Sequence, residues 1–131
     1  MIVLDTHIWV NWIVNGNQAS SEPVINAMTA DSSWAISAIS CFEVSFLVKR
    51  GKLKLPLPVD EWLREALENS GIESLPVTCE IMPKAAMLSD IHRDPADRII
   101  IATALACDAK LASIDSLFPD YPELKGRLVG K

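Results

Sequence analysis

Carboxylates that follow apolar segments are the residues of this chain whose type and spacing point most directly to chemistry. Asp5 follows the apolar run 1–4, and Asp115 follows a second expected strand at 110–114. In open α/β sheets, ligands bind beyond the carboxyl ends of the strands. If the two runs form neighbouring parallel strands, the two carboxylates meet at one edge of the sheet.

Two further acids, Glu43 and Asp97, lie within or beside apolar helical segments. The helix expected around Glu43 is apolar enough to be largely buried, and Asp97 precedes the apolar run 99–102. A buried carboxylate needs a cation, a metal ion or a proton, and few basic residues stand near these acids in the sequence. No matching set of Cys or His accompanies the acids. Oxygen ligands alone favour Mg²⁺ or Mn²⁺ over zinc.

Each acid also has a purely structural interpretation, which its sequence context leaves open. Asp5 could cap the following helix, Glu43 could pair with an arginine, and Asp115 could belong to a turn. Asp94 is a favourable N-cap because a proline follows it, which would put Asp97 in the first helical turn. We therefore expect Asp97 to be the metal ligand, with Asp94 as its possible substitute.

The apolar pattern predicts short strands that alternate with helices. Strands are expected at 1–4, 34–37, 72–77, 110–114 and 127–129. Helices are expected at 7–14, 59–69, 79–89 and 94–107; a second helix carries Pro23 in its first turn, and the third ends at 49–51. Ser20 or Ser21 is expected to cap the second helix, and Ser37 or Ser40 the third. This alternation predicts an α/β fold with a parallel sheet of four to five strands and helices on both faces. With no linker or repeat, residues 1–131 are expected to form a single domain.

Composition narrows the class of protein. Half of the residues are hydrophobic and 22% are charged, which is typical of a globular protein without a membrane span. The net charge of −5 argues against a protein that coats nucleic acid by bulk positive charge, but it suits an enzyme whose carboxylates hold cations. The three widely spaced cysteines, Cys41, Cys79 and Cys107, are expected to be buried free thiols in a reducing cytoplasm.

The acids occur within an ordered set of motifs that covers nearly the whole chain. Asp5-Thr6 follows an apolar strand, residues 37–43 read SAISCFE, residues 94–104 read DPADRIIIATA, and residues 113–115 read SID. This order resembles the PIN-domain nucleases, most closely the VapC-type toxins of bacterial and archaeal toxin–antitoxin pairs. The resemblance implies a metal-dependent endoribonuclease whose acidic quartet is Asp5, Glu43, Asp97 and Asp115. Ser113 stands where those toxins usually have threonine, and it keeps the hydroxyl.

The resemblance also implies how such a quartet would work on a phosphodiester. A cation held by the acids would neutralise the scissile phosphate and lower the pKa of a nearby water. Asp5 and Asp97 are expected to ligate it directly, while Glu43 and Asp115 ligate or help to activate the nucleophile. The hydroxyls of Thr6 and Ser113 are expected to orient the acids.

The resemblance further implies an RNA substrate, a homodimer and a small antitoxin protein laid across the acidic cleft. Arg93 and Arg98 are the side chains expected to guide a phosphate or to pair with a carboxylate. The only basic cluster could complement a helix end or bind phosphate, and it consists of Lys49, Arg50, Lys52 and Lys54. His7 is expected in the first helix and His92 in a loop, both without a catalytic role, since neither has an evident orienting partner.

Each alternative function predicts a different set of residues in the sequence. A haloacid-dehalogenase-type phosphotransferase would have a second aspartate where His7 stands, and a receiver domain would have paired acids at the first strand's end. A degenerate PIN-like module that only binds RNA or protein would lack a quartet member, whereas a housekeeping RNA-processing nuclease would keep all four. Trp9, Trp12, Ile13, Phe46 and Leu47 could extend the apolar surface beyond one core, but ordinary core packing is the expectation.

Overall fold

In the computed structural model, which describes residues 1–16, 20–91 and 93–130, the strands form one parallel sheet. The strands are β1 (Ile2–Leu4), β2 (Trp34–Ser37), β3 (Glu73–Leu75), β4 (Lys110–Ala112) and β5 (Leu128–Val129). Their order across the sheet is β3-β2-β1-β4-β5, and every neighbouring pair is parallel. The expected parallel sheet of four to five strands is confirmed, with β1 and β4 as direct neighbours.

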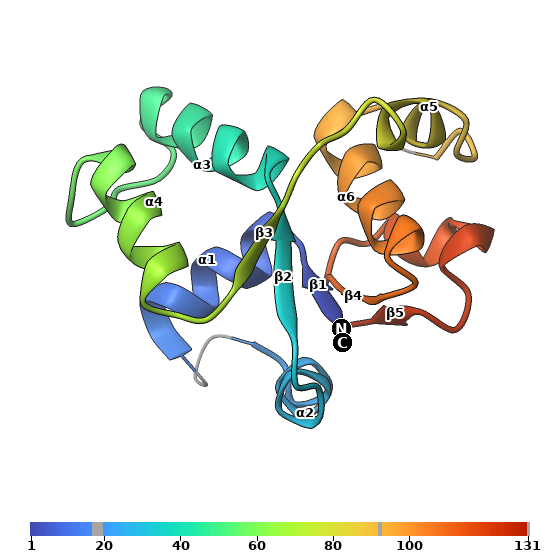
Figure 1. The fold of residues 1–131 in the computed structure, drawn as a ribbon, viewed down its shortest axis with the longest axis horizontal. Helices are drawn as coiled ribbons and strands as arrows, with labels where there is room; N and C mark the ends of the chain where they lie inside the picture. Colours follow the sequence, from blue (N-terminus) through green and yellow to red (C-terminus); the bar gives the residue numbers. More distant parts are fainter. Residues whose placement is uncertain (17–19, 92, 131) are drawn as a thin grey trace.

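Side chains of the central strand alternate between two hydrophobic cores, because successive residues of a strand point to opposite faces. Ile2 and Leu4 pack with helices α1 (Thr6–Asn15) and α4 (Val59–Glu68). Val3 packs on the other face, with α6 (Pro95–Ala106) and the short 3-10 helices at 118–120 and 122–124. Both faces of the sheet are therefore covered, as Figure 1 shows.

Three further helices complete the fold: α2 (Glu22–Ala30), α3 (Ile39–Lys49) and α5 (Ile81–Ala86). Helix α3 packs against α1 and α4 and also contacts α6. Helices α3 and α6 stand on either side of the sheet at the end toward which the β2 arrow points (Figure 1). That end carries the carboxyl ends of the parallel strands.

Several element boundaries differ from the sequence-based expectation. Strand β3 and helix α5 are shorter than the expected ranges 72–77 and 79–89. The N-cap position of α3 is Ala38 rather than a serine. Ser21 occupies the N-cap of α2 as expected, but its hydroxyl donates to the carbonyl of Gly130 at 3.2 Å instead of accepting from the helix.

The expectation that α3 is largely buried is wrong. Only Ser40 and Val44 of this helix are buried, whereas Phe42 is 62% exposed and Phe46 is 39% exposed. One side of α3 packs on the core, and its outer side lies at the open end of the sheet. Trp9 is buried and both Trp12 and Ile13 pack against the core, so the expected core packing holds for α1 but fails for Phe46.

The cysteines also depart from expectation. Cys41 is half-buried, while Cys79 and Cys107 are exposed, because they lie just before α5 and just after α6. Their free thiols are confirmed, but their burial is not. Among the described helices, none combines the length and apolar character needed to cross a membrane.

Candidate active site

Asp5 lies between the end of β1 and the start of α1. Its backbone extends the strand pairing, and its side chain caps the helix. Its N–H donates to the carbonyl of Ala112 at 3.0 Å, which extends the pairing of β1 with β4. Its Oδ1 accepts from the N–H of Ile8 at 2.8 Å, and its Oδ2 accepts from Ser113 Oγ at 2.5 Å. Asp5 is thus the N-cap of α1, and this role holds its buried carboxylate at the carboxyl end of the sheet.

Ser113 connects Asp5 to the turn that carries Asp115. While Ser113 Oγ donates to Asp5, it also accepts from the N–H of Asp115 at 3.1 Å. Asp115 Oδ1 accepts from the N–H of Leu117 at 2.8 Å, as expected for an aspartate that stabilises a turn. Since β1 and β4 are neighbours, the two acids follow adjacent strands at one edge of the sheet.

Glu43 reaches the same edge from α3 and is oriented by a hydroxyl of α1. Thr6 Oγ1 donates to Glu43 Oε1 at 2.5 Å and lies 2.9 Å from Ser40 Oγ. Thr6 has a single hydroxyl proton, so Ser40 supplies the second hydrogen bond as donor. Ser40 is a buried site residue that the sequence-based analysis treated only as a possible cap. Its position three residues before Glu43, on the same face of a helix, was the available signal.

Asp94 and Asp97 come from the start of α6 on the opposite side of the sheet end. Asp94 is the N-cap, and its Oδ1 accepts from the N–H of Ala96 at 2.9 Å. Asp97 lies in the first turn, as expected. Even so, Asp94 offers an oxygen to the same cluster, because Glu43, Asp94 and Asp97 each have one carboxylate oxygen within 4.8 Å of the others.

Burial and mutual repulsion perturb the pKa values of the clustered acids. Burial, and after it repulsion from Asp94, Glu43, Asp115 and Asp5, raises the pKa of Asp97 to about 7. Burial likewise raises the pKa of Asp5, against the hydrogen bonds from Ser113 and Ile8. Burial raises the pKa of Glu43 too, while the hydrogen bond from Thr6 lowers it. These acids therefore interact electrostatically as one group.

The cluster fits a hard divalent cation. Hard cations such as Mg²⁺ and Mn²⁺ take carboxylate oxygens as ligands, and here three acids place oxygens close enough to share one ion. Positive charge among them would relieve the repulsion that raises the pKa of Asp97. Thr6 and Ser113 each hold one carboxylate in a fixed orientation, which is the usual role of groups behind metal ligands.

Arg98 lies close to the acids in sequence but is bonded elsewhere. Its guanidinium donates to backbone carbonyls at the end of α5, namely those of Ala85, Ala86, Leu88 and Ser89, at 2.8–3.1 Å. These hydrogen bonds fix the segment after α5. Arg93 and His7 are exposed, and His92 lies outside the described residues.

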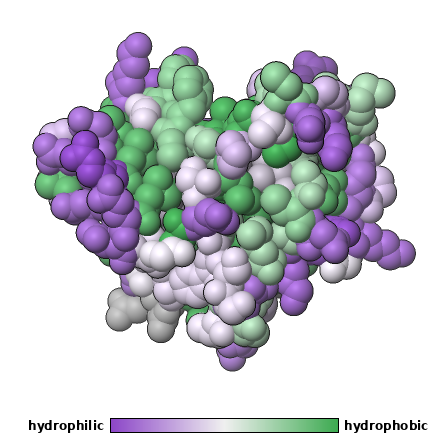
Figure 2. All heavy atoms as spheres, viewed as in Figure 1, coloured by the Kyte–Doolittle hydropathy of each residue, from purple (hydrophilic) through white to green (hydrophobic). Residues whose placement is uncertain are grey.

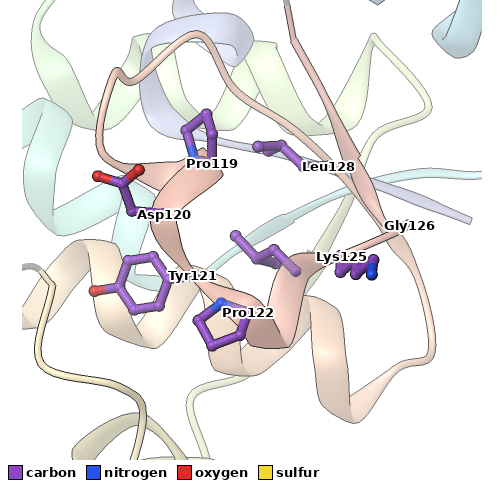
Figure 3. A pocket seen from close by; sticks show the side chains of 8 residues that line it. Pro119, Asp120, Tyr121, Pro122, Lys125, Gly126 and Leu128 are labelled. Atoms are coloured by element: carbon purple, nitrogen blue, oxygen red, sulfur yellow. The ribbon is translucent and has the colours of Figure 1, made fainter.

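The surface is notched between α3 and α6, above the ends of the strands (Figure 2). The cluster lies at this notch, since Glu43 belongs to α3 and both Asp94 and Asp97 to the start of α6. A separate hollow of about 350 Å³ lies against the 3-10 helices and β5, lined by Tyr121, Lys125 and Leu128 among others (Figure 3). None of the clustered acids lines that hollow, so the acidic site is the open notch.

Comparisons with known proteins agree with this geometry. The chain is 31% identical over 121 residues to Ribonuclease VapC22 of Mycobacterium tuberculosis, with 87% of this chain and 86% of the relative covered. Its fold is similar to a VapBC2 structure from Rickettsia felis bound to a promoter DNA fragment, with a TM-score of 0.69, 22% identity and coverage of 99% of this chain and 98% of that one.

A toxin–antitoxin complex from Klebsiella pneumoniae is also similar in fold, with a TM-score of 0.67, 22% identity and coverage of 98% of this chain and 96% of that one. Residues 2–124 match the PIN domain family, a span that includes every acid of the cluster. The parallel sheet, the acids at its carboxyl edge and these matches lead to one conclusion: this chain belongs to the PIN domain family.

Proposed function

We propose that this protein is a Mg²⁺- or Mn²⁺-dependent endoribonuclease and the toxin of a type II toxin–antitoxin system. The observation that carries the proposal is the convergence of acids from separate segments, Asp5, Glu43, Asp94, Asp97 and Asp115, on one edge of the sheet. The relative named a ribonuclease supports the activity, and the structural neighbours described as toxin–antitoxin assemblies support the biological role.

We expect Asp5, Glu43, Asp97 and Asp115 to form the catalytic quartet, with Asp94 beside Asp97 as a further ligand. A bound divalent cation would supply positive charge that neutralises the scissile phosphate and lowers the pKa of a nearby water. Glu43 is suited to accept a proton from the attacking water, since Thr6 fixes one of its oxygens and burial raises its pKa. Ser113 holds Asp5 at the carboxyl edge of the sheet.

Cleavage of a labelled single-stranded RNA by highly purified protein tests this proposal. We expect cleavage with Mg²⁺ or Mn²⁺, none with excess EDTA, and a loss in the variant Asp97→Asn. Glu73→Gln is the matched control, because it removes the same charge from an exposed residue of the edge strand β3. Equal cleavage in excess EDTA, or undiminished cleavage by Asp97→Asn, would show that the acids are not a metal-dependent catalytic centre.

The partners and the cellular setting belong to the same proposal. We expect the protein to act in the cytoplasm as a homodimer and to be inhibited by a small antitoxin that covers the acidic notch. Expression alone should arrest growth of a bacterial host, and co-expression of a short neighbouring reading frame should restore it. Normal growth with abundant active protein would favour a housekeeping RNA-processing nuclease, and normal growth with inactive protein would favour a degenerate binding module.

A further inference from the structure

The outer side of α3 exposes a pair of stacked aromatic rings. Phe42 and Phe46 are four residues apart and therefore share one side of the helix. Their ring centroids lie 5.7 Å apart and their planes differ by 16°. Both rings contact solvent, and Phe42 is 62% exposed. Exposing large apolar rings to water is unfavourable, so a stacked and exposed pair indicates a surface that a ligand covers.

Positively charged residues follow the two phenylalanines toward the C-terminal end of α3. The guanidinium carbon of Arg50 lies 4.4 Å from the centroid of the Phe46 ring. Lys49, Lys52 and Lys54 are near it in the chain and are exposed, and residues 49–54 contain no acid. In Figure 2 the surface over α3, at the upper left, carries hydrophobic and hydrophilic atoms side by side. A protein of net charge −5 thus carries a local cationic cluster next to two aromatic rings.

The aromatic pair also borders the acidic site. Phe42 directly precedes Glu43 in the chain, and Phe46 lies one helical turn after it. A strand of nucleic acid whose phosphate lies at Glu43 and the other acids would therefore run next to these rings. Its neighbouring phosphates could reach the cationic end of α3. Aromatic rings for bases, together with cations for phosphates, are the two components of a sequence-tolerant single-strand binding surface.

We propose that unpaired bases of a single-stranded RNA stack on Phe42 and Phe46, while Arg50 and the adjacent lysines contact the flanking phosphates. The proposal rests on the proposed function for the identity of the ligand. Charge complementarity favours RNA as the occupant, because the surface joins π-faces to a cluster of like positive charges. This surface selects for unpaired strands, since a base inside a duplex cannot offer its face to a side chain.

Binding of fluorescent RNA measures this surface without requiring catalysis. All variants are made in an Asp97→Asn background and assayed in EDTA by fluorescence anisotropy at low salt. The probes are a ten-nucleotide oligoadenylate and the same strand with its bases removed. Phe42→Ala and Phe42→Leu should each weaken binding of the oligoadenylate by about 5- to 100-fold, whereas Phe42→Trp should bind at least as tightly as the parent. Phe42→Ala should leave binding of the abasic strand within about twofold of the parent.

The leucine variant separates base stacking from general apolar contact, because it keeps an apolar side chain but lacks a ring. Met87→Ala is the matched control, since Met87 is also apolar and exposed but lies at the end of α5. It should not change RNA binding. The proposal is overturned if Phe42→Leu binds the oligoadenylate as the parent does, or if Phe42→Ala weakens both probes equally.

It is also overturned if Phe42→Ala leaves RNA binding unchanged and converts a dimer to a monomer in sedimentation, because the rings would then form a contact between copies. Failure of the proposed function has a different signature. A protein that binds oligoadenylate through Phe42 but never cleaves RNA with Mn²⁺ would refute the nuclease proposal and support the stacking surface.

Discussion

Replacing Asp97 by asparagine should stabilise the metal-free protein at pH 8. The pKa of Asp97 rises from 3.8 to about 7, mainly through burial and then through the neighbouring acids. Between these pH values the folded protein holds a proton that the unfolded chain has released. The free energy of unfolding therefore falls as the pH rises through this range, and it stays low at higher pH. Asparagine is uncharged at every pH and avoids this loss.

The size of the effect follows from the change in pKa. Each tenfold change in the acid dissociation constant is worth about 1.4 kcal/mol, so the full rise in the pKa of Asp97 corresponds to about 4 kcal/mol. Asp97 is only half-buried, and solvent screening reduces this to about 2 kcal/mol. For a domain of this length, that difference should raise the melting temperature by about 6 °C.

Thermal unfolding in EDTA at pH 5 and pH 8 measures the difference in melting temperature between Asp97→Asn and the parent. The advantage of Asp97→Asn over the parent should reach about a third of its full size at pH 5 and its full size at pH 8. Glu73→Gln, which removes an exposed charge outside the cluster, should show little change at either pH. Added Mn²⁺ should then raise the melting temperature of the parent more than that of Asp97→Asn. If this difference in melting temperature is absent, or is equal at both pH values, the ionised carboxylate of Asp97 does not destabilise the metal-free protein.

Substitutions at three further residues test individual contacts. Asp94→Asn should keep the cap on α6 and its stability, whereas Asp94→Ala should lose about 1 kcal/mol in chemical denaturation; equal stability of the two would contradict the cap. Ser113→Ala removes the donor to Asp5 and should weaken Mn²⁺ binding by about 10- to 100-fold in a calorimetric titration, and unchanged affinity would show that the hydroxyl does not orient the ligand. Arg98→Ala should cost about 3 kcal/mol of stability, because the carbonyls after α5 lose their charged donor, and hydrogen exchange should rise there first.

The sequence predicted the framework of the site because that framework depends on local patterns. Apolar runs of strand length, separated by helical segments, specify parallel strands, and acids directly after two of them fall on the carboxyl edge. Asp5 and Asp115 follow β1 and β4, which are neighbours in the sheet. For Asp5, the cap interpretation is confirmed, and the cap holds the carboxylate at the carboxyl edge of the sheet.

The sequence could not predict which faces are covered, because burial depends on elements far away in the chain. An apolar helix predicted burial of α3, yet the helix lies at an open end of the sheet and exposes Phe42 and Phe46. Proximity in sequence suggested that Arg98 serves the acids. Because α5 packs against α6, the guanidinium also meets carbonyls at the end of α5, which proximity in sequence did not predict. Spacing along the chain carries no information about such contacts.

The local sequence therefore determined the α/β class, the α6 cap at Asp94 and the acids available for a metal, since each depends on residues within a few positions of one another. Tertiary structure alone decided that Asp94 joins Glu43 and Asp97 in one cluster, and that Thr6 and Ser113 each donate to an acid. It alone left the side of α3 that carries Phe42 and Phe46 exposed. These contacts join α1 to α3 and the β1 edge to the β4 edge, across separations in sequence that no local preference can encode.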